Sequence, residues 1–286
     1  MLRLLNLAFA LCLSAATALA QNSVPADSRL KSITGKKIIR VAYRADASPF
    51  SFISSGEPVG YTIDLCVLVT KSLADQFGLG ELKIEWVPVT VDTRFSAVAA
   101  GNADMECGSS TTTLGRMKEV DFSNLTFVES TGVLVTRASN THAFADMAGK
   151  KIAVVAGTSN ARAVTLQVRA QKLDVTLIEV KDRDAGSAAL EAGTVDGFAS
   201  DKLLLAGAQL KRPEALVLLP DDLSIEPYAI VLPRGDWALR LAVNTALAHI
   251  YTGPAIDAIY GRWFGRAGLR PGPLLQAVYA LGGLAD

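Results

Sequence analysis

Three arginines, a hydroxyl-rich loop and one acidic residue follow the predicted strands of this chain, each near the point where a strand ends. The residues concerned are Arg44, Arg94, the loop 109–113 with Arg116, the stretch Gly157 to Ser159, and Asp201. In open α/β sheets, ligands bind at the carboxyl ends of the strands, where loops and helix starts meet. We therefore expect these side chains to lie along one edge of the sheets.

Together, these residue types suit a small zwitterion that carries one further anion. A guanidinium binds a carboxylate through two parallel hydrogen bonds, and a hydrogen bond to a charged group contributes about 1.5–3 kcal/mol. A helix start at Gly157 to Ser159 would offer free backbone N–H groups, which also favour an anion. Asp201 supplies the negative charge that an ammonium group requires. The set predicts a site for an acidic amino acid such as aspartate or glutamate.

Each of these residues also has an ordinary structural explanation. An arginine at a strand end is often only a solvated surface charge. Runs of serine and threonine are common in loops and helix caps. The interpretation therefore depends on whether the fold brings the residues together.

The elements that would position the site are short β-rich runs that alternate with helical patterns, which is typical of α/β folds with mainly parallel sheets flanked by helices. Strands are expected at residues 37–43, 82–89, 103–108, 151–156, 175–180 and 197–200, and helices at 62–77, 92–100 and 159–168. Residues 95–104 and 187–196 share one layout: a helical run, a glycine at its end and an aspartate three residues later. Many α/β units look like this, but the repeat is consistent with two similar halves that face a cleft.

Two extended apolar stretches, 127–136 and 225–233, are candidates for crossings between two lobes. We expect residues 36–130 and 228–286 to form the first lobe, and residues 131–227 to form the second. Residues 236–263 predict two helices that pack on the first lobe. Asp236 would cap the first helix, and Gly253 with Pro254 would separate the two.

The N-terminus predicts export. Arg3 is the only charge in residues 1–20, an apolar run covers residues 4–16, and Ala18-Leu19-Ala20 fits a signal peptidase site. The apolar run is too short for a membrane span, which needs about 20 residues. We expect cleavage after Ala20, a loose leader at residues 21–35 and a periplasmic location.

Composition and cysteine usage exclude several functions. The formal net charge is +0 and no block of lysine or arginine occurs, which argues against a nucleic-acid partner. Cys66 and Cys107 lack metal-binding spacing; two buried thiols are favoured slightly over a disulfide, which the compartment would permit. His142 and His249 are isolated in sequence. No metal, no cofactor and no catalytic residue is expected.

The order of short motifs resembles the bacterial solute-binding proteins of family 3, the extracellular components of polar amino-acid ABC importers, and most of all their periplasmic glutamate/aspartate-binding members. The motifs are SPFSF at 48–52, VGYTID at 59–64, ECGSSTTTLGR at 106–116, DFS at 121–123, FADMAGK at 144–150, GTS at 157–159, ALEAGTVD at 189–196 and WF at 263–264. The resemblance spans roughly residues 36–270. It implies a two-lobed periplasmic-binding-protein fold of type II, an inner-membrane permease as partner, and a monomer.

The resemblance also implies a role for each site residue. Arg116 would clamp the α-carboxylate, with backbone N–H groups of Thr111 and of Thr158 or Ser159. Asp201 would receive the α-ammonium, beside Ser109 and Thr111. Arg44 and Arg94 would hold a side-chain carboxylate, and Phe50 would pack on the aliphatic part of the ligand. The full set is Arg44, Phe50, Arg94, Ser109, Thr111, Arg116, Thr158, Ser159 and Asp201.

Three positions depart from the glutamate/aspartate-binding pattern. Val91 stands where a hydroxyl residue is usual, and Arg183 where a histidine is usual. The distal pocket is therefore expected to be reshaped, with Arg183 as a further anion contact. Ile230 replaces the cysteine that would pair with Cys107 in the family, so that disulfide cannot form.

Two other classes of function remain open at this point. The same scaffold hosts periplasmic dehydratases of cyclic acids, which need a general acid or base in the cleft. The expected cleft edge offers Asp46 and Asp201, and Asp201 is already assigned to the ammonium. A sensor or adaptor that binds a protein, or a receptor for another polar amino acid, is a further alternative.

Overall fold

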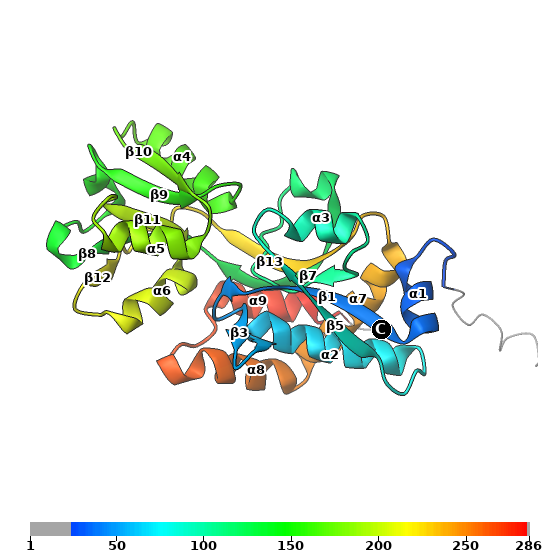
Figure 1. The fold of residues 1–286 in the computed structure, drawn as a ribbon. Coiled ribbons are helices and arrows are strands. Elements are labelled where there is room, and N and C mark those ends of the chain that lie inside the picture. Colours follow the sequence, from blue (N-terminus) through cyan, green and yellow to red (C-terminus); the bar gives the residue numbers. More distant parts are fainter. Residues whose placement is uncertain (1–23, 285–286) are drawn as a thin grey trace, which may run out of the picture.

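The computed structural model describes residues 24–284 and shows two lobes, each built on its own five-stranded sheet (Figure 1). The predicted signal peptide, residues 1–20, lies outside the described residues. Among residues 24–284, no helix is long and apolar enough to cross a membrane.

The sheet of the first lobe has the order β5-β1-β6-β13-β7. Its strands are β1 (Ile38–Arg44), β5 (Lys83–Val89), β6 (Met105–Glu106), β7 (Val120–Glu129) and β13 (Glu226–Pro233). β1 pairs in parallel with β5 and β6, whereas β13 runs antiparallel to β6 and β7. A small antiparallel sheet of β2 (Asp46–Ala47), β3 (Ser51–Ser54) and β4 (Glu57–Val59) follows β1.

The sheet of the second lobe has the order β10-β9-β11-β8-β12. Its strands are β8 (Thr131–Thr136), β9 (Lys151–Val155), β10 (Thr176–Val180), β11 (Gly197–Asp201) and β12 (Leu216–Leu218). β9 is parallel to β10 and β11, and β8 is antiparallel to β11 and β12. Each sheet is therefore mixed, because one strand runs against the others: β13 in the first lobe and β8 in the second. The chain passes from β7 to β8 through Ser130 and returns at β13, so two strands connect the lobes (Figure 1).

Nine α-helices are present in the described residues: α1 (Arg29–Lys36), α2 (Tyr61–Gln76), α3 (Arg94–Ala99), α4 (Ser159–Ala170), α5 (Arg183–Glu191), α6 (Lys202–Lys211), α7 (Trp237–Thr252), α8 (Ala255–Trp263) and α9 (Pro273–Gly282). The six predicted strands are confirmed as β1, β5, β6, β9, β10 and β11, and the three predicted helices as α2, α3 and α4. The predicted pair at residues 236–263 is α7 and α8, and the Asp236 side chain accepts the Leu239 N–H at 3.1 Å as the N-cap of α7.

The repeated layout of residues 95–104 and 187–196 corresponds to one structural unit in each lobe. Gly101 and Gly193 end α3 and α5 with φ angles of 80° and 68°. In the first lobe, Asp104 accepts the backbone N–H of Arg40 at 2.8 Å, and its own N–H donates to the Arg40 carbonyl. In the second lobe, Asp196 makes the same two bonds to Lys151. Each aspartate thus joins the end of its helix to a strand of its sheet, β1 in the first lobe and β9 in the second.

The prediction of a loose leader at residues 21–35 is wrong for its second half, where α1 forms. Ser28 caps this helix, and its hydroxyl donates to Asp236 at 2.7 Å. The N–H of Arg29 donates to the same carboxylate at 2.8 Å. Leu30 and Ile33 are buried in the core of the first lobe. The carboxylate of Asp236 and the burial of Leu30 and Ile33 therefore stabilise a helix in a segment whose own sequence is mainly polar.

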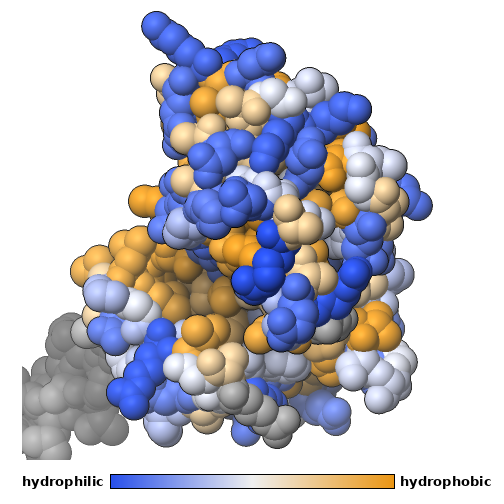
Figure 2. All heavy atoms as spheres, turned by 90° about the vertical axis from the view of Figure 1, so that its left-hand side faces the viewer, coloured by the Kyte–Doolittle hydropathy of each residue, from blue (hydrophilic) through white to orange (hydrophobic). Residues whose placement is uncertain are grey.

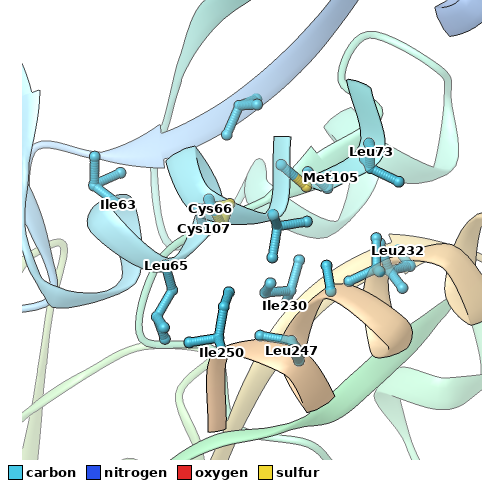
Figure 3. Close-up of a cluster of buried hydrophobic side chains, with 14 of the residues drawn as sticks. Ile63, Leu65, Cys66, Leu73, Met105, Cys107, Ile230, Leu232, Leu247 and Ile250 are labelled. Carbon is cyan, nitrogen blue, oxygen red and sulfur yellow. A yellow bond between two sulfur atoms is a disulfide. The ribbon is translucent and has the colours of Figure 1, made fainter. Parts of the chain in front are cut away.

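The expectation of two free buried thiols is also wrong, because Cys66 and Cys107 form a disulfide (Figure 3). Cys66 lies on the buried face of α2, and Cys107 directly follows β6. α2 covers the sheet there, and the two Cα atoms are 6.4 Å apart, within the usual range for a disulfide. Ile230 of β13 lies in the same apolar cluster.

Hydrophilic and hydrophobic side chains are unevenly distributed on the face seen in Figure 2. In Figure 2 the outer face of the second lobe is mainly hydrophilic, with hydrophobic residues in a hollow below it. Each lobe has its own buried clusters, built around α2 and α7 in the first and around β8 and β9 in the second. Each lobe thus has its own core and two strands join the lobes, an arrangement that permits hinge motion.

Candidate functional site

Eight of the nine predicted site residues line one cavity between the lobes. Its lining consists of Arg44, Val91, Arg94, Ser109, Thr111, Arg116, Thr158, Ser159, Asn160, Arg183 and Asp201. The cavity measures about 10 Å³, which is room for about one water molecule. A solute the size of an amino acid can enter only when the surrounding groups move apart.

Phe50 is the exception, because it does not line this cavity. Its side chain is fully buried, with ring centroids of Tyr61, Phe127, Tyr228 and Phe264 between 4.9 and 6.0 Å away. The hairpin of β2 and β3 turns Phe50 toward α2 and away from the cleft. In this arrangement Phe50 packs the core of the first lobe and does not contact a solute in the cavity.

Arg94 and Arg116 share one aromatic neighbour. Their guanidinium carbons lie 4.3 and 4.8 Å from the centroid of the Phe95 ring, within the range of cation–π interactions. Arg94 donates to the Val91 carbonyl, and Arg116 donates to the Thr111 carbonyl at 2.6 Å. Within residues 24–284 neither arginine has a salt bridge to a carboxylate.

Burial makes the charge on these two arginines costly. Burial first, and the nearby Arg116 second, lower the pKa of Arg94 to about 9. Burial likewise lowers the pKa of Arg116, and the carboxylates of Glu226 and Glu106 oppose this effect. The Nε of Arg94 is buried and has no hydrogen-bond partner in the described part of the chain. A bound anion would stabilise both guanidinium groups.

Arg44 and Arg183 are instead paired with aspartates. Arg44 at the end of β1 donates through one terminal nitrogen to both oxygens of Asp46, at 2.6 and 2.7 Å. Arg183 at the start of α5 lies 3.4 Å from Asp46 and 3.5 Å from Asp201. Since Asp46 belongs to the first lobe and Asp201 to the second, Arg183 joins the two lobes electrostatically.

The start of α4 presents hydrogen-bond donors to the cavity. Thr158 is the N-cap, and its hydroxyl accepts the Ala161 N–H at 3.1 Å. Asn160 donates to Asp201 at 3.1 Å and to Thr131 at 2.8 Å. The positive end of this helix therefore faces the cavity with Ser159, as the sequence predicted.

A chain of hydroxyl groups connects the site to the strands between the lobes. Ser159 donates to Thr111 at 3.2 Å, and Thr111 donates to Glu226 at 2.7 Å. Glu226, the first residue of β13, also accepts from Thr131 at 3.2 Å and from Ser224 at 2.6 Å. Ser109 also lines the cavity, and its hydroxyl oxygen is buried with no hydrogen-bond partner in the described residues.

Val91 contributes to contact between the lobes. It comes from the loop after β5, yet it packs in an apolar cluster that includes Leu134, Val155 and Phe198 of the second lobe. The family pattern leads one to expect a hydroxyl residue at this position. The apolar Val91 side chain offers no hydrogen bond to the cavity. This apolar contact stabilises the closed arrangement of the lobes.

Sequence reasoning did not assign several residues of the site, namely Asp46 as a partner of arginine, Phe95, Asn160 and Glu226. Phe95 directly follows Arg94, which is a weak signal for a cation–π contact. Asp46 was considered only as a possible general acid or base. No group of three histidine, cysteine or acidic residues within 24–284 is arranged to hold a metal ion.

With this geometry established, comparison with known proteins identifies the class. The chain belongs to the bacterial extracellular solute-binding proteins of family 3, whose family model matches residues 39–266. The expected two-lobed α/β fold and the expected family are confirmed.

Two curated relatives carry more specific names. The chain is 33% identical over 239 residues to an L-glutamate/L-aspartate-binding protein of Pseudomonas aeruginosa, with 82% of this chain and 79% of the relative covered. It is 28% identical over 259 residues to a glutamate/aspartate import solute-binding protein of Escherichia coli, with 89% and 86% covered.

Solved structures give the same fold. An ancestral arginine-binding protein bound to arginine matches with a TM-score of 0.72 and 27% identity, over 80% of this chain and 99% of its own. An ancestral amino-acid-binding protein, described as a precursor of cyclohexadienyl dehydratase, matches with a TM-score of 0.72 and 27% identity, over 83% and 100%.

Proposed function

We propose that this chain is the periplasmic solute-binding component of an amino-acid ABC importer and that it binds an acidic amino acid of the glutamate/aspartate class. The observation that carries the proposal is the pair Arg94 and Arg116. Arg94 is buried and Arg116 is half-buried, neither has a salt bridge to a carboxylate in the described residues, and both line the same cavity as Asp201. The two guanidinium groups match the two carboxylates of an acidic amino acid, and Asp201 matches its ammonium group.

In this proposal Arg116 binds the α-carboxylate, assisted by N–H groups of Thr111 and of Thr158 or Ser159. Asp201 receives the ammonium beside Ser109, and Arg94 with Arg44 binds the distal carboxylate. The names of the curated relatives support the acidic class. The chain acts as a monomer that presents its closed form to a permease.

Isothermal titration calorimetry at pH 7 tests the ligand class. L-glutamate, L-aspartate, L-glutamine, L-asparagine and L-arginine are titrated separately into the mature protein. We expect the two acidic amino acids to bind most tightly. Tight binding of arginine or of an amide, with no binding of either acid, would refute the proposal.

Enzymatic activity is tested in the same samples, because one structural neighbour is the precursor of a dehydratase. The bound amino acid is followed by proton NMR over several hours. A pure receptor returns the amino acid unchanged, whereas a new set of product signals would assign the cleft to an enzyme.

A further inference from the structure

Asp46 lies at the outer boundary of the cavity, between two arginines that come from different lobes. Arg44 donates to both of its carboxylate oxygens at 2.6 and 2.7 Å, and Arg183 lies 3.4 Å from Oδ2. Both arginines line the cavity between the lobes. Asp46 itself lines two outer clefts of about 410 and 360 Å³, and 22% of its side chain is exposed. Its carboxylate is therefore accessible to solvent and at the same time contacts two arginines that line the inner cavity.

The Asp46 carboxyl is charged at neutral pH. Partial burial works against the charged form, but Arg44 and Arg183 outweigh it and lower the pKa of Asp46 below its usual value. This anion is consequently a permanent part of the site over the physiological pH range.

Asp46 changes the balance of charge around the cavity. The described lining carries four arginines and a single aspartate, Asp201. Asp46 adds a second negative charge and engages one terminal nitrogen of Arg44, while the Nε of Arg44 is buried without a hydrogen-bond partner among residues 24–284. A distal anion of a ligand thus meets an arginine that already binds a carboxylate of the protein. Two like charges next to one guanidinium repel each other.

We propose that Asp46 is a specificity-determining residue, which occupies Arg44 and Arg183 as an internal anion and so reduces the preference of the cleft for an acidic side chain over its amide. The inference rests on the proposed binding of acidic amino acids. It assigns to this chain a weaker discrimination between acid and amide than its four arginines alone would give.

The test is the variant Asp46→Asn, which keeps the size of the side chain and removes its charge. Wild type and variant are titrated by calorimetry with glutamate and glutamine, and with aspartate and asparagine. We expect the affinity ratio of acid to amide to rise at least about tenfold, because Arg44 and Arg183 lose their competing anion. Asp184→Asn is the matched control, since exposed Asp184 lines the same outer clefts and forms no salt bridge with either arginine in the described residues.

A second pair of variants uses the opposite charge. Arg183→Gln should lower the acid-to-amide ratio, and the double variant Asp46→Asn/Arg183→Gln, whose net charge equals that of the wild type, should return it toward the wild-type ratio. Asp46→Ser repeats the test if the asparagine variant does not fold, as judged by circular dichroism.

The possible outcomes separate this inference from the function on which it rests. If Asp46 only latches the two lobes together, its removal weakens acid and amide equally and leaves the ratio unchanged, which overturns the inference. A ratio that falls overturns it as well, and in both cases the wild type still binds glutamate or aspartate. If the wild type binds neither acid, the proposed function itself fails.

Discussion

Ser159, at the start of α4 in the second lobe, donates a hydrogen bond of 3.2 Å to Thr111 in the first lobe. The Thr111 carbonyl accepts the Arg116 guanidinium at 2.6 Å, and its hydroxyl donates to Glu226 on the strand between the lobes. One threonine therefore connects the helix start, the proposed carboxylate clamp and the hinge. Closure of the lobes and binding of a carboxylate are expected to be coupled through this residue.

Replacement of Arg116 tests the carboxylate clamp. Arg116→Ala should weaken the binding of glutamate and aspartate at least about 100-fold, because the α-carboxylate loses its bidentate partner and stays buried in the closed cleft. Calorimetry measures the affinity, and Arg169→Ala, on the exposed face at the end of α4, is the control. Unchanged affinity in Arg116→Ala would remove this arginine from the site.

Arg94 and Arg44 should contribute unequally to the recognition of the distal carboxylate. Arg94 has no carboxylate partner in the described chain, whereas Arg44 is already bound by Asp46. Arg94→Met is thus expected to weaken glutamate more than Arg44→Met does, and each variant should affect glutamine less than glutamate. Side-by-side titrations of both ligands measure this. Equal losses for glutamate and glutamine would show that these arginines shape the pocket without recognising the charge.

The disulfide should stabilise the first lobe. Cys66 and Cys107 are 41 residues apart, and closing a loop of that length in the unfolded chain is worth about 2–4 kcal/mol. The double variant Cys66→Ala/Cys107→Ala should lower the free energy of unfolding in urea by that amount. A reductant should destabilise the wild type and leave the double variant unaffected. If the wild type unfolds at the same urea concentration with and without reductant, the bond does not form in solution.

Residues whose position follows from a strand end could be predicted from sequence. Arg44 and Asp201 are the last residues of β1 and β11, and parallel strands bring such ends to one edge. The start of α4 could be predicted in the same way, because Thr158 caps a helix that follows β9. Local patterns were sufficient for these residues, since the topology of α/β units fixes where strand ends lie.

Contacts between distant segments could not be predicted in that way. The salt bridge between Asp46 and Arg183 joins residues 137 positions apart in the chain. The same limit applies to α1, whose cap depends on Asp236, and to the disulfide, which requires α2 to pack over the end of β6. Phe50 was misplaced for another reason: the register of the hairpin after β1 decides which side chains face the core, and that register has no clear sequence signal.

Stability should depend on pH through Glu129, the last residue of β7. Burial raises the pKa of the Glu129 carboxyl from 4.5 to about 8, against the hydrogen bond that it accepts from the Ser130 N–H. The folded state then binds a proton more tightly than the unfolded state, so this group's contribution to stability is complete below pH 4.5 and is lost as the pH rises through 8.

Glu129→Gln should remove this dependence, because the amide resembles the neutral acid and cannot ionise. Near pH 4.5 the wild type and the variant should have similar free energies of unfolding in urea. Above pH 8 the variant should be more stable, by an amount on the order of 5 kcal/mol if the full shift is realised. The exposed Glu119→Gln, at the end of the loop before β7, is the control and should follow the wild type at every pH. Parallel pH profiles for wild type and Glu129→Gln would show that this carboxyl ionises in the folded protein as it does in the unfolded chain.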